Sequence, residues 1–176
     1  MDDNRTSRTG DIFLRTADGF ENLGYLLVAS GYLVVRSRVL LVHHNAFDKW
    51  VPPGGHIVPG ETFSEAAVRE CLEETGLVVS AISATAILHP ADDNATPEPT
   101  PFYVDILREG FRRPCLTQYF FLDLVDRTKE PTLIPEADEV YGARFFGEEE
   151  LADIPTFDQV RSLCRFALAH HPRRAS

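Results

Sequence analysis

The chain has 176 residues, of which 44% are hydrophobic and 25% are charged, a composition sufficient for one globular domain with a buried core. It carries 17 Lys and Arg against 27 Asp and Glu, a formal net charge of −10 at pH 7, which argues against a general nucleic-acid surface held by phosphate contacts. The first residues lack the apolar core of a signal peptide and no apolar run is long enough to span a bilayer, so we expect a cytoplasmic protein with no membrane partner.

The N-terminal part of the chain predicts strands followed by a loop. Residues 1–30 have no decisive hydrophobic period, and their structure is uncertain from sequence. From Tyr32 onward two β-rich runs, YLVV and VLLVHH, are separated by RSR, which predicts a hairpin or a sharp bend. Residues 45–55, NAFDKWVPPGG, are rich in Asn, Asp, Pro and Gly and predict a loop.

A helix is predicted over residues 63–75. Thr62 and Glu65 form a T-x-x-E capping box at its start, and Gly76 suits the left-handed conformation that ends a helix. At 100° per residue, the stripe that can face the core consists of Ser64, Val68, Cys71, Leu72 and Thr75. A different face carries Glu70, Glu73 and Glu74.

The rest of the chain predicts four more strands and a second helix. Strands are expected over residues 77–88, 102–107, 116–125 and 141–146, with a long proline-rich loop over 89–101 and another over 126–139. A helix is expected over 157–170, where Thr156 and Gln159 make a T-x-x-Q capping signature, and residues 171–176 are expected to form a flexible tail. These elements predict a single domain, 1–176, with a mixed sheet covered by helices on its faces.

The three glutamates on the predicted helix are unfavourable for the helix itself. Like charges at i, i+3 and i, i+4 cost about 0.2–0.5 kcal/mol per pair, and carboxylates in the last turn oppose the helix dipole. A bound divalent cation would explain them, because hard cations take oxygen ligands. The alternative is a solvated acidic helix face.

The residues around these glutamates favour the metal site. From Gly55 to Leu77 the sequence reads G-x5-E-x7-R-E-C-x-E-E-x-G-L, which resembles the Nudix box of the Nudix hydrolase family. Cys71 is the single departure, since an aliphatic residue is usual there. The resemblance implies a Nudix-like α/β/α sandwich and a hydrolase that cleaves a pyrophosphate bond in a nucleoside diphosphate linked to another moiety, by attack of a metal-activated water on phosphorus.

The resemblance also implies roles for individual residues. The metal it implies is Mg²⁺, with Mn²⁺ as an alternative ion. Its implied ligands are the carbonyl of Gly55 and the carboxylates of Glu61, Glu70, Glu73 and Glu74. Arg69 is expected to hold neighbouring carboxylates by charge-assisted hydrogen bonds. For the general base, Glu74 is the first candidate. Glu136 and Glu139 are candidates from a distant loop, where exposed loop charges are the alternative reading.

Substrate selectivity is expected outside the box. Arg112 and Arg113 could bind a terminal phosphate or a second pyrophosphate, and His56 could contact a phosphate; solvated turn charges are the alternative for the arginines. His43 and His44 could line the same cleft, and Trp50 is expected to anchor the loop before the box. Candidates for stacking on a base are Phe102, Tyr103, Tyr119 and Phe120, with strand core as their alternative.

Two other functions remain open from the sequence. One is a module that binds a nucleotide without hydrolysing it, and the other is a prenyl diphosphate isomerase, as in one branch of the superfamily. The expected partner in the leading interpretation is a small phosphorylated nucleotide derivative. The sequence does not identify that substrate, and it leaves the oligomeric state open, with a homodimer as one option.

Overall fold

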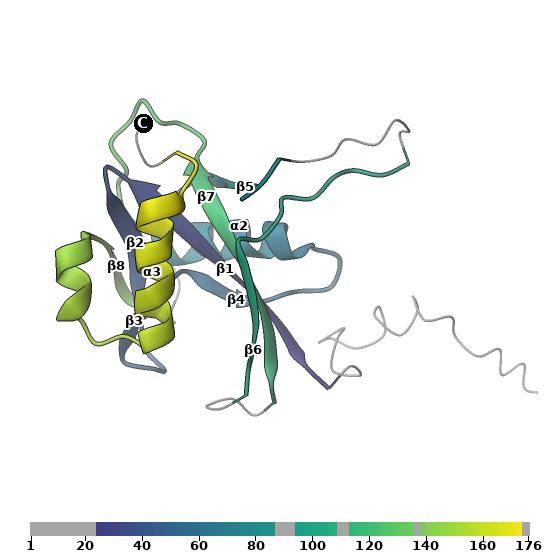
Figure 1. Ribbon diagram of the computed structural model, residues 1–176, viewed down its shortest axis with the longest axis horizontal. Coiled ribbons are helices and arrows are strands. Elements are labelled where there is room, and N and C mark those ends of the chain that lie inside the picture. Colours follow the sequence, from purple (N-terminus) through teal and green to yellow (C-terminus); the bar gives the residue numbers. More distant parts are fainter. Residues whose placement is uncertain (1–23, 87–93, 109–112, 136–137, 139, 174–176) are drawn as a thin grey trace, which may run out of the picture.

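The computed structural model of the protein describes residues 24–86, 94–108, 113–135, 138 and 140–173. Within them an eight-stranded sheet is flanked by helices (Figure 1). The strands are β1 (Leu26–Val35), β2 (Arg38–His44), β3 (Lys49–Val51), β4 (Gly54–His56), β5 (Val79–Ile82), β6 (Tyr103–Leu107), β7 (Cys115–Leu124) and β8 (Val140–Phe146). The helices are α2 (Phe63–Thr75), the 3-10 helix η2 (Glu148–Ala152) and α3 (Asp158–His170). None of the helices in this part of the chain is long and apolar enough to cross a membrane.

Strand β1 is the centre of the sheet, because three other strands pair with it. It runs parallel to β7 from the pair Leu26↔Cys115 onward and antiparallel to β4 and β2. The turn to β2 consists of Arg36 and Ser37, whose φ angles of 48° and 59° suit a two-residue hairpin. The predicted hairpin is therefore confirmed, and β1 begins earlier than expected, inside the segment that the sequence left uncertain.

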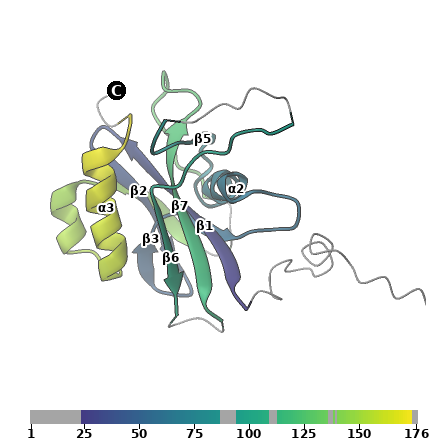
Figure 2. The same cartoon turned by 45° about the vertical axis from the view of Figure 1, so that its right-hand side comes forward.

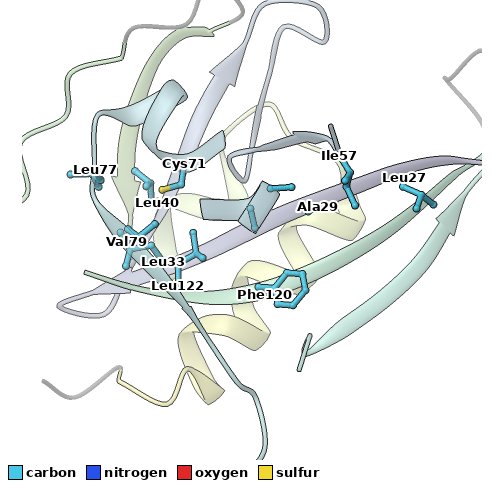
Figure 3. Packing of buried hydrophobic residues seen from close by; sticks show 12 residues of the cluster. Leu27, Ala29, Leu33, Leu40, Ile57, Cys71, Leu77, Val79, Phe120 and Leu122 are labelled. Carbon is cyan, nitrogen blue, oxygen red and sulfur yellow. The ribbon is translucent and has the colours of Figure 1, made fainter. Parts of the chain in front are cut away.

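Two apolar clusters lie on the two faces of the sheet. Helix α2 packs over a cluster that includes Leu33, Leu40 and Phe120 (Figure 3), and α3 packs over another that includes Tyr32 and Phe146. Figure 2 shows the two helices on opposite sides of the strands. The predicted mixed sheet within an α/β/α sandwich is confirmed.

Helix α2 has the predicted bounds because its end signals are local. The Thr62 hydroxyl accepts the N–H of Glu65 at 3.3 Å, and the Glu65 carboxylate accepts the N–H of Thr62 at 2.8 Å. Gly76 ends the helix with φ 73°. Cys71, the departure from the box pattern, is fully buried in the core between α2 and the sheet.

The buried face of α2 includes Ser64, Cys71 and Thr75 of the predicted stripe but differs from it at other positions. Leu72 was expected in the core but is 45% exposed, whereas Ala67 is fully buried. Glu74 was expected on the outer face with the other two glutamates of the box, but it is only 2% exposed. The helix therefore turns its Ala67 side toward the sheet, which brings the neighbouring Glu74 inward as well.

Short strands occupy part of the chain that was predicted to be a loop. Residues 45–55 contain β3 and the start of β4, and β4 pairs with β1. Conversely, within residues 77–86, the described part of the strand expected over 77–88, only β5 is a strand. Strand β3 pairs with the preceding strand β2, and β4 pairs with the more distant β1, and local composition reports neither pairing.

The predicted cap of the last helix is wrong. Helix α3 has Phe157 as its N-cap, and Thr156 instead donates a hydrogen bond to the carbonyl of Trp50. Gln159 donates to the carboxylate of Asp105 on β6. Both side chains of the T-x-x-Q signature are thus used in long-range contacts rather than at the helix end.

The segment expected to be a flexible tail begins with a buried residue. His171 is 1% exposed, and its Nε2 lies 2.9 Å from the carbonyl oxygen of Leu122. Its Nδ1 accepts the N–H of Arg173 at 3.0 Å. The chain is therefore attached to β7 beyond the end of α3, and residues 174–176 lie outside the described part.

Candidate metal and catalytic site

Two glycines of β4 let this strand approach both β1 and α2. Gly54 pairs with Ser30, and a Cβ atom at position 54 would lie 2.3 Å from the Ser30 hydroxyl oxygen. A Cβ at Gly55 would lie 2.4 Å from Oε1 of Glu70. Any side chain at either position would collide, so glycine is needed for the carboxylate of Glu70 to lie against the backbone.

Glu74 is the buried member of the three glutamates. Its Oε2 accepts a hydrogen bond from the N–H of Gly54 at 3.0 Å. Glu70 is partly buried, with 15% of its side chain exposed, whereas the side chain of Glu73 is 52% exposed. The three carboxylates thus range from the edge of the core to solvent, while all belonging to the C-terminal half of α2.

Arg69 joins the loop before the helix to the glutamates on it. Its guanidinium donates two hydrogen bonds to Glu61, at 3.0 Å to Oε2 and 2.8 Å to Oε1. It also donates to Oε1 of Glu70 at 2.7 Å and to Oε2 of Glu73 at 3.1 Å. A further bond, at 3.0 Å, reaches the carbonyl of His56. The expected contacts of Arg69 with neighbouring carboxylates are therefore present.

These contacts favour the charged forms of Glu61 and Arg69. Burial raises the pKa of Glu61, but hydrogen bonds from Arg69 and from the N–H of Val58 outweigh burial and hold the pKa below its usual value. The pKa of Arg69 is raised, mainly by its hydrogen bond to Glu61 and despite partial burial. Both partners are therefore charged across the pH range in which proteins function.

The donor set suits a hard divalent cation. All candidate side chains offer carboxylate oxygens, which are the ligands that Mg²⁺ and similar ions take. In the described part of the chain, no three acidic, histidine or cysteine side chains surround one point closely enough to hold an ion as they stand. The carboxylate of Glu70 nevertheless lies close to Gly55, the residue whose carbonyl is the expected ligand. The residues present fit the implied metal.

The other expected phosphate contacts are only partly described. His56 is exposed on β4, next to the glycine pair. Arg113 lies just before β7, close to the N-terminal end of β1, where the N–H of Leu26 bonds to Pro114. Arg112, Glu136 and Glu139 lie outside the described residues, so their roles stay predictions.

The four aromatic residues considered for base stacking differ in exposure. Tyr119 and Phe120 are 4% and 2% exposed, so they belong to the core, which was the alternative reading. Phe102 is half-buried and stacks on Phe121 with ring centroids 4.3 Å apart. Tyr103 is 42% exposed on the edge strand β6. A flat ligand could therefore reach only Tyr103 among the four without rearrangement.

Two backbone groups of the site were missed by sequence reasoning. These are the N–H of Gly54, which binds Glu74, and the carbonyl of His56, which binds Arg69. The adjacent glycines were the available signal, since paired glycines indicate a close approach of backbone to another group.

Comparison with known proteins agrees with this fold. The family model described as NUDIX domain matches residues 25–164. The chain is 47% identical over 51 residues to the m7GpppN-mRNA hydrolase NUDT17 of Xenopus laevis, a match that covers 29% of this chain and 16% of that protein. It is 27% identical over 130 residues to the asymmetrical Bis(5'-nucleosyl)-tetraphosphatase of Rattus norvegicus, covering 69% of this chain and 67% of that protein.

Solved structures share the fold at low sequence identity. A NUDIX family hydrolase from Clostridium perfringens superposes with a TM-score of 0.65 at 22% identity, over 81% of this chain and 95% of that chain. The fold and the site define an α/β/α sandwich with an oxygen-rich acidic site on its first described helix. The domain match shows that the chain belongs to the Nudix hydrolase family. That the whole chain forms one domain stays a prediction.

Proposed function

We propose that the chain is a Mg²⁺-dependent hydrolase that cleaves a pyrophosphate bond in a nucleoside diphosphate linked to another moiety. The observation that carries this proposal is the arrangement of Glu70 against the Gly55 backbone, with Arg69 joining it to Glu61 and Glu73. Membership of the Nudix hydrolase family and the match to a tetraphosphatase support the choice of a pyrophosphate bond.

The ion would be held by this chain's carboxylates and one carbonyl. Glu70, Glu73 and Glu74 would supply helix oxygens, Gly55 its carbonyl, and Glu61 an oxygen or an orienting contact. When bound, the cation neutralises charge on the diphosphate and makes water more acidic. Arg69 holds the carboxylates of Glu61, Glu70 and Glu73 in fixed positions relative to one another, because its planar guanidinium donates hydrogen bonds to all three.

The protein must also accept the proton that the attacking water loses. In the reaction a bond forms between the water oxygen and phosphorus, and the anhydride P–O bond breaks. Glu74 was the first candidate for the base, but it is 2% exposed and already accepts the N–H of Gly54. Glu73, with 52% of its side chain exposed, has better access to water and is the preferred base within the box. Glu139 stays the alternative from the distant loop.

A substrate panel tests the proposal. Purified protein is incubated with NDP-sugars, dinucleoside polyphosphates and nucleoside triphosphates, with Mg²⁺, with Mn²⁺ and with EDTA, and product nucleotides are separated by chromatography. We expect turnover that EDTA abolishes and that the variant Glu73→Gln loses. Glu148→Gln, at an exposed glutamate in η2, is the matched control and should keep full activity.

Other outcomes of the panel identify the rival functions. Binding of a nucleotide without any product would indicate a non-hydrolytic module. Conversion of isopentenyl diphosphate, included as a counter-screen, would indicate an isomerase. Turnover that persists in EDTA would contradict the metal-dependent mechanism.

A further inference from the structure

Three aromatic rings form a row across β3, β2 and β8. The ring of Trp50 stacks on that of His43, with centroids 5.1 Å apart and an interplanar angle of 16°. On the other side of His43, the ring of Tyr141 lies edge-on with a centroid distance of 5.4 Å. Trp50 and His43 are directly opposite in the strand pairing, so they share one face of the sheet.

A β-bulge brings Tyr141 into this row. Along β8, Gly142 pairs with His43 and Val140 pairs with His44, which leaves Tyr141 as the extra residue of the bulge. An ordinary strand would point Tyr141 to the face opposite Gly142, whereas a bulge turns the extra side chain toward its neighbour's face. The bulge therefore explains how Tyr141 contacts His43.

The position beside His43 on β8 is open. Gly142 has no side chain, and a Cβ built there would meet no atom within 4 Å. Gly142 is also absent from the described glycines with positive φ, so its backbone does not require glycine. The missing side chain thus leaves open space at the position that pairs with His43.

The row packs against the core at its Trp50 end and is exposed to solvent at its Tyr141 end. Trp50 packs on Phe146 with centroids 4.8 Å apart, and Nε2 of His43 lies 3.1 Å from Oδ1 of Asp48. Tyr141 is 71% exposed, the largest exposure among the exposed large hydrophobic side chains of the described residues. Fixed rings that end in an exposed ring form a surface on which a flat molecule can stack.

The row is also close to the candidate metal site along the chain. Trp50 is joined to Gly54 by Val51, Pro52 and Pro53, and both prolines are buried. Four residues span at most about 14 Å, which is the scale of one nucleotide. One nucleotide is therefore long enough to span the distance between the glycine pair and Trp50.

We infer that Trp50, His43 and Tyr141 form a stacking site for the nucleobase of the substrate. This inference rests on the proposed function, which supplies the diphosphate end of the ligand. The Tyr141 hydroxyl also offers a polar group at the exposed end of the row, which suits a heteroaromatic base better than a purely apolar group. The core aromatics on β7 cannot serve this role because they are buried.

Fluorescence provides a direct test, because Trp50 is the single tryptophan of the chain. Nucleoside monophosphates contain no pyrophosphate bond, so they can be titrated with Mg²⁺ present and without turnover. We expect AMP and GMP to quench Trp50 fluorescence, and ribose 5-phosphate, which lacks a base, to leave it unchanged. Equal quenching by ribose 5-phosphate, or no quenching by any nucleotide, would overturn the inference.

Variants separate stacking from other causes of quenching. Tyr141→Ala should weaken nucleotide binding at least about fivefold, since base–aromatic stacking has this magnitude or more, and Tyr141→Phe should restore it. Gly142→Leu should also weaken binding by filling the open space. Phe166→Ala, at another exposed aromatic residue and on α3, is the matched control and should leave binding unchanged.

The outcomes distinguish this inference from the proposed function. Hydrolysis of the substrate panel without base-dependent quenching leaves the function standing and rejects the stacking site. Base-dependent quenching that Tyr141→Ala weakens, without hydrolysis, supports the site and rejects the function. If Tyr141→Ala changes the oligomeric state in light scattering but not nucleotide binding, the row is a contact between copies of the chain, which overturns the inference.

Discussion

The buried carboxylate of Glu74 accepts a hydrogen bond from the backbone N–H of Gly54 at 3.0 Å, across 20 positions of sequence. This bond connects the last turn of α2 to β4, which itself pairs with β1. A residue that a sequence pattern associates with metal binding is therefore also a structural link between the helix and the sheet.

The first prediction separates these two roles. Glu74→Ala should lower the free energy of unfolding by about 1–3 kcal/mol, because it leaves the N–H of Gly54 without its acceptor. Glu73→Ala should change stability by less than about 0.5 kcal/mol, since more than half of its side chain is exposed. Urea denaturation followed by circular dichroism measures both. Equal losses in the two variants would show that the Gly54 bond has no structural importance.

Burial of Glu74 also shows where sequence reasoning reached its limit. The bounds of α2 were predicted correctly, because a capping box and a terminal glycine act within a few residues of the helix ends. The rotation of the helix about its axis was not predicted correctly, because this rotation depends on which side chains fit against the sheet. Ala67 is small enough to face the sheet, and Leu72 is left in solvent.

Long-range contacts explain the other differences. Thr156 and Gln159 fit a helix-capping pattern, yet their side chains bond to Trp50 and Asp105, which are remote in sequence. The signal for the bulge at Tyr141 was present, since an isolated glycine inside a strand pattern indicates a bulge. The bulge brings Tyr141 into contact with His43, and predicting this contact would have required the pairing register of β2 and β8.

The second prediction concerns Arg69. Lysine carries the same charge, but its single ammonium group cannot reproduce the bonds that the guanidinium makes to Glu61, Glu70 and Glu73 together. Arg69→Lys should therefore raise the Mg²⁺ concentration needed for half-maximal activity by about 10–100-fold. Activity is measured against Mg²⁺ concentration, and circular dichroism verifies the fold. Unchanged metal dependence would contradict the role of Arg69 in holding the carboxylates.

The third prediction concerns Tyr32, whose side chain is fully buried below α3. Its hydroxyl has no hydrogen-bond partner among the described residues, and burial is the main cause that raises its pKa. Because a buried unpaired hydroxyl is unfavourable, Tyr32→Phe should raise the free energy of unfolding by about 1 kcal/mol. A loss of stability on urea denaturation would show that the hydroxyl is hydrogen-bonded in solution.

The fourth prediction concerns the pH dependence of stability through His171. Burial lowers the pKa of this histidine from its ordinary value of 6.5, while the carbonyl of Leu122 and the charge of Asp123 oppose the shift only partly. With Nδ1 accepting the N–H of Arg173, the ring is neutral and donates from Nε2 to the Leu122 carbonyl. A second proton would have to displace the Arg173 contact.

The sign of the effect follows from proton uptake. Below about pH 6.5, His171 becomes protonated in the unfolded chain, whereas the folded chain resists this protonation. The unfolded state therefore binds more protons, and the free energy of unfolding decreases as the pH is lowered, until the pH passes the lower pKa of the folded state. The contribution is fully present above this range. The urea midpoint should therefore drop more between pH 7.5 and 5.5 in the wild type than in His171→Gln. His170→Gln, at the exposed neighbouring histidine, should keep the wild-type drop, and an equal drop in His171→Gln would show that His171 does not carry the effect.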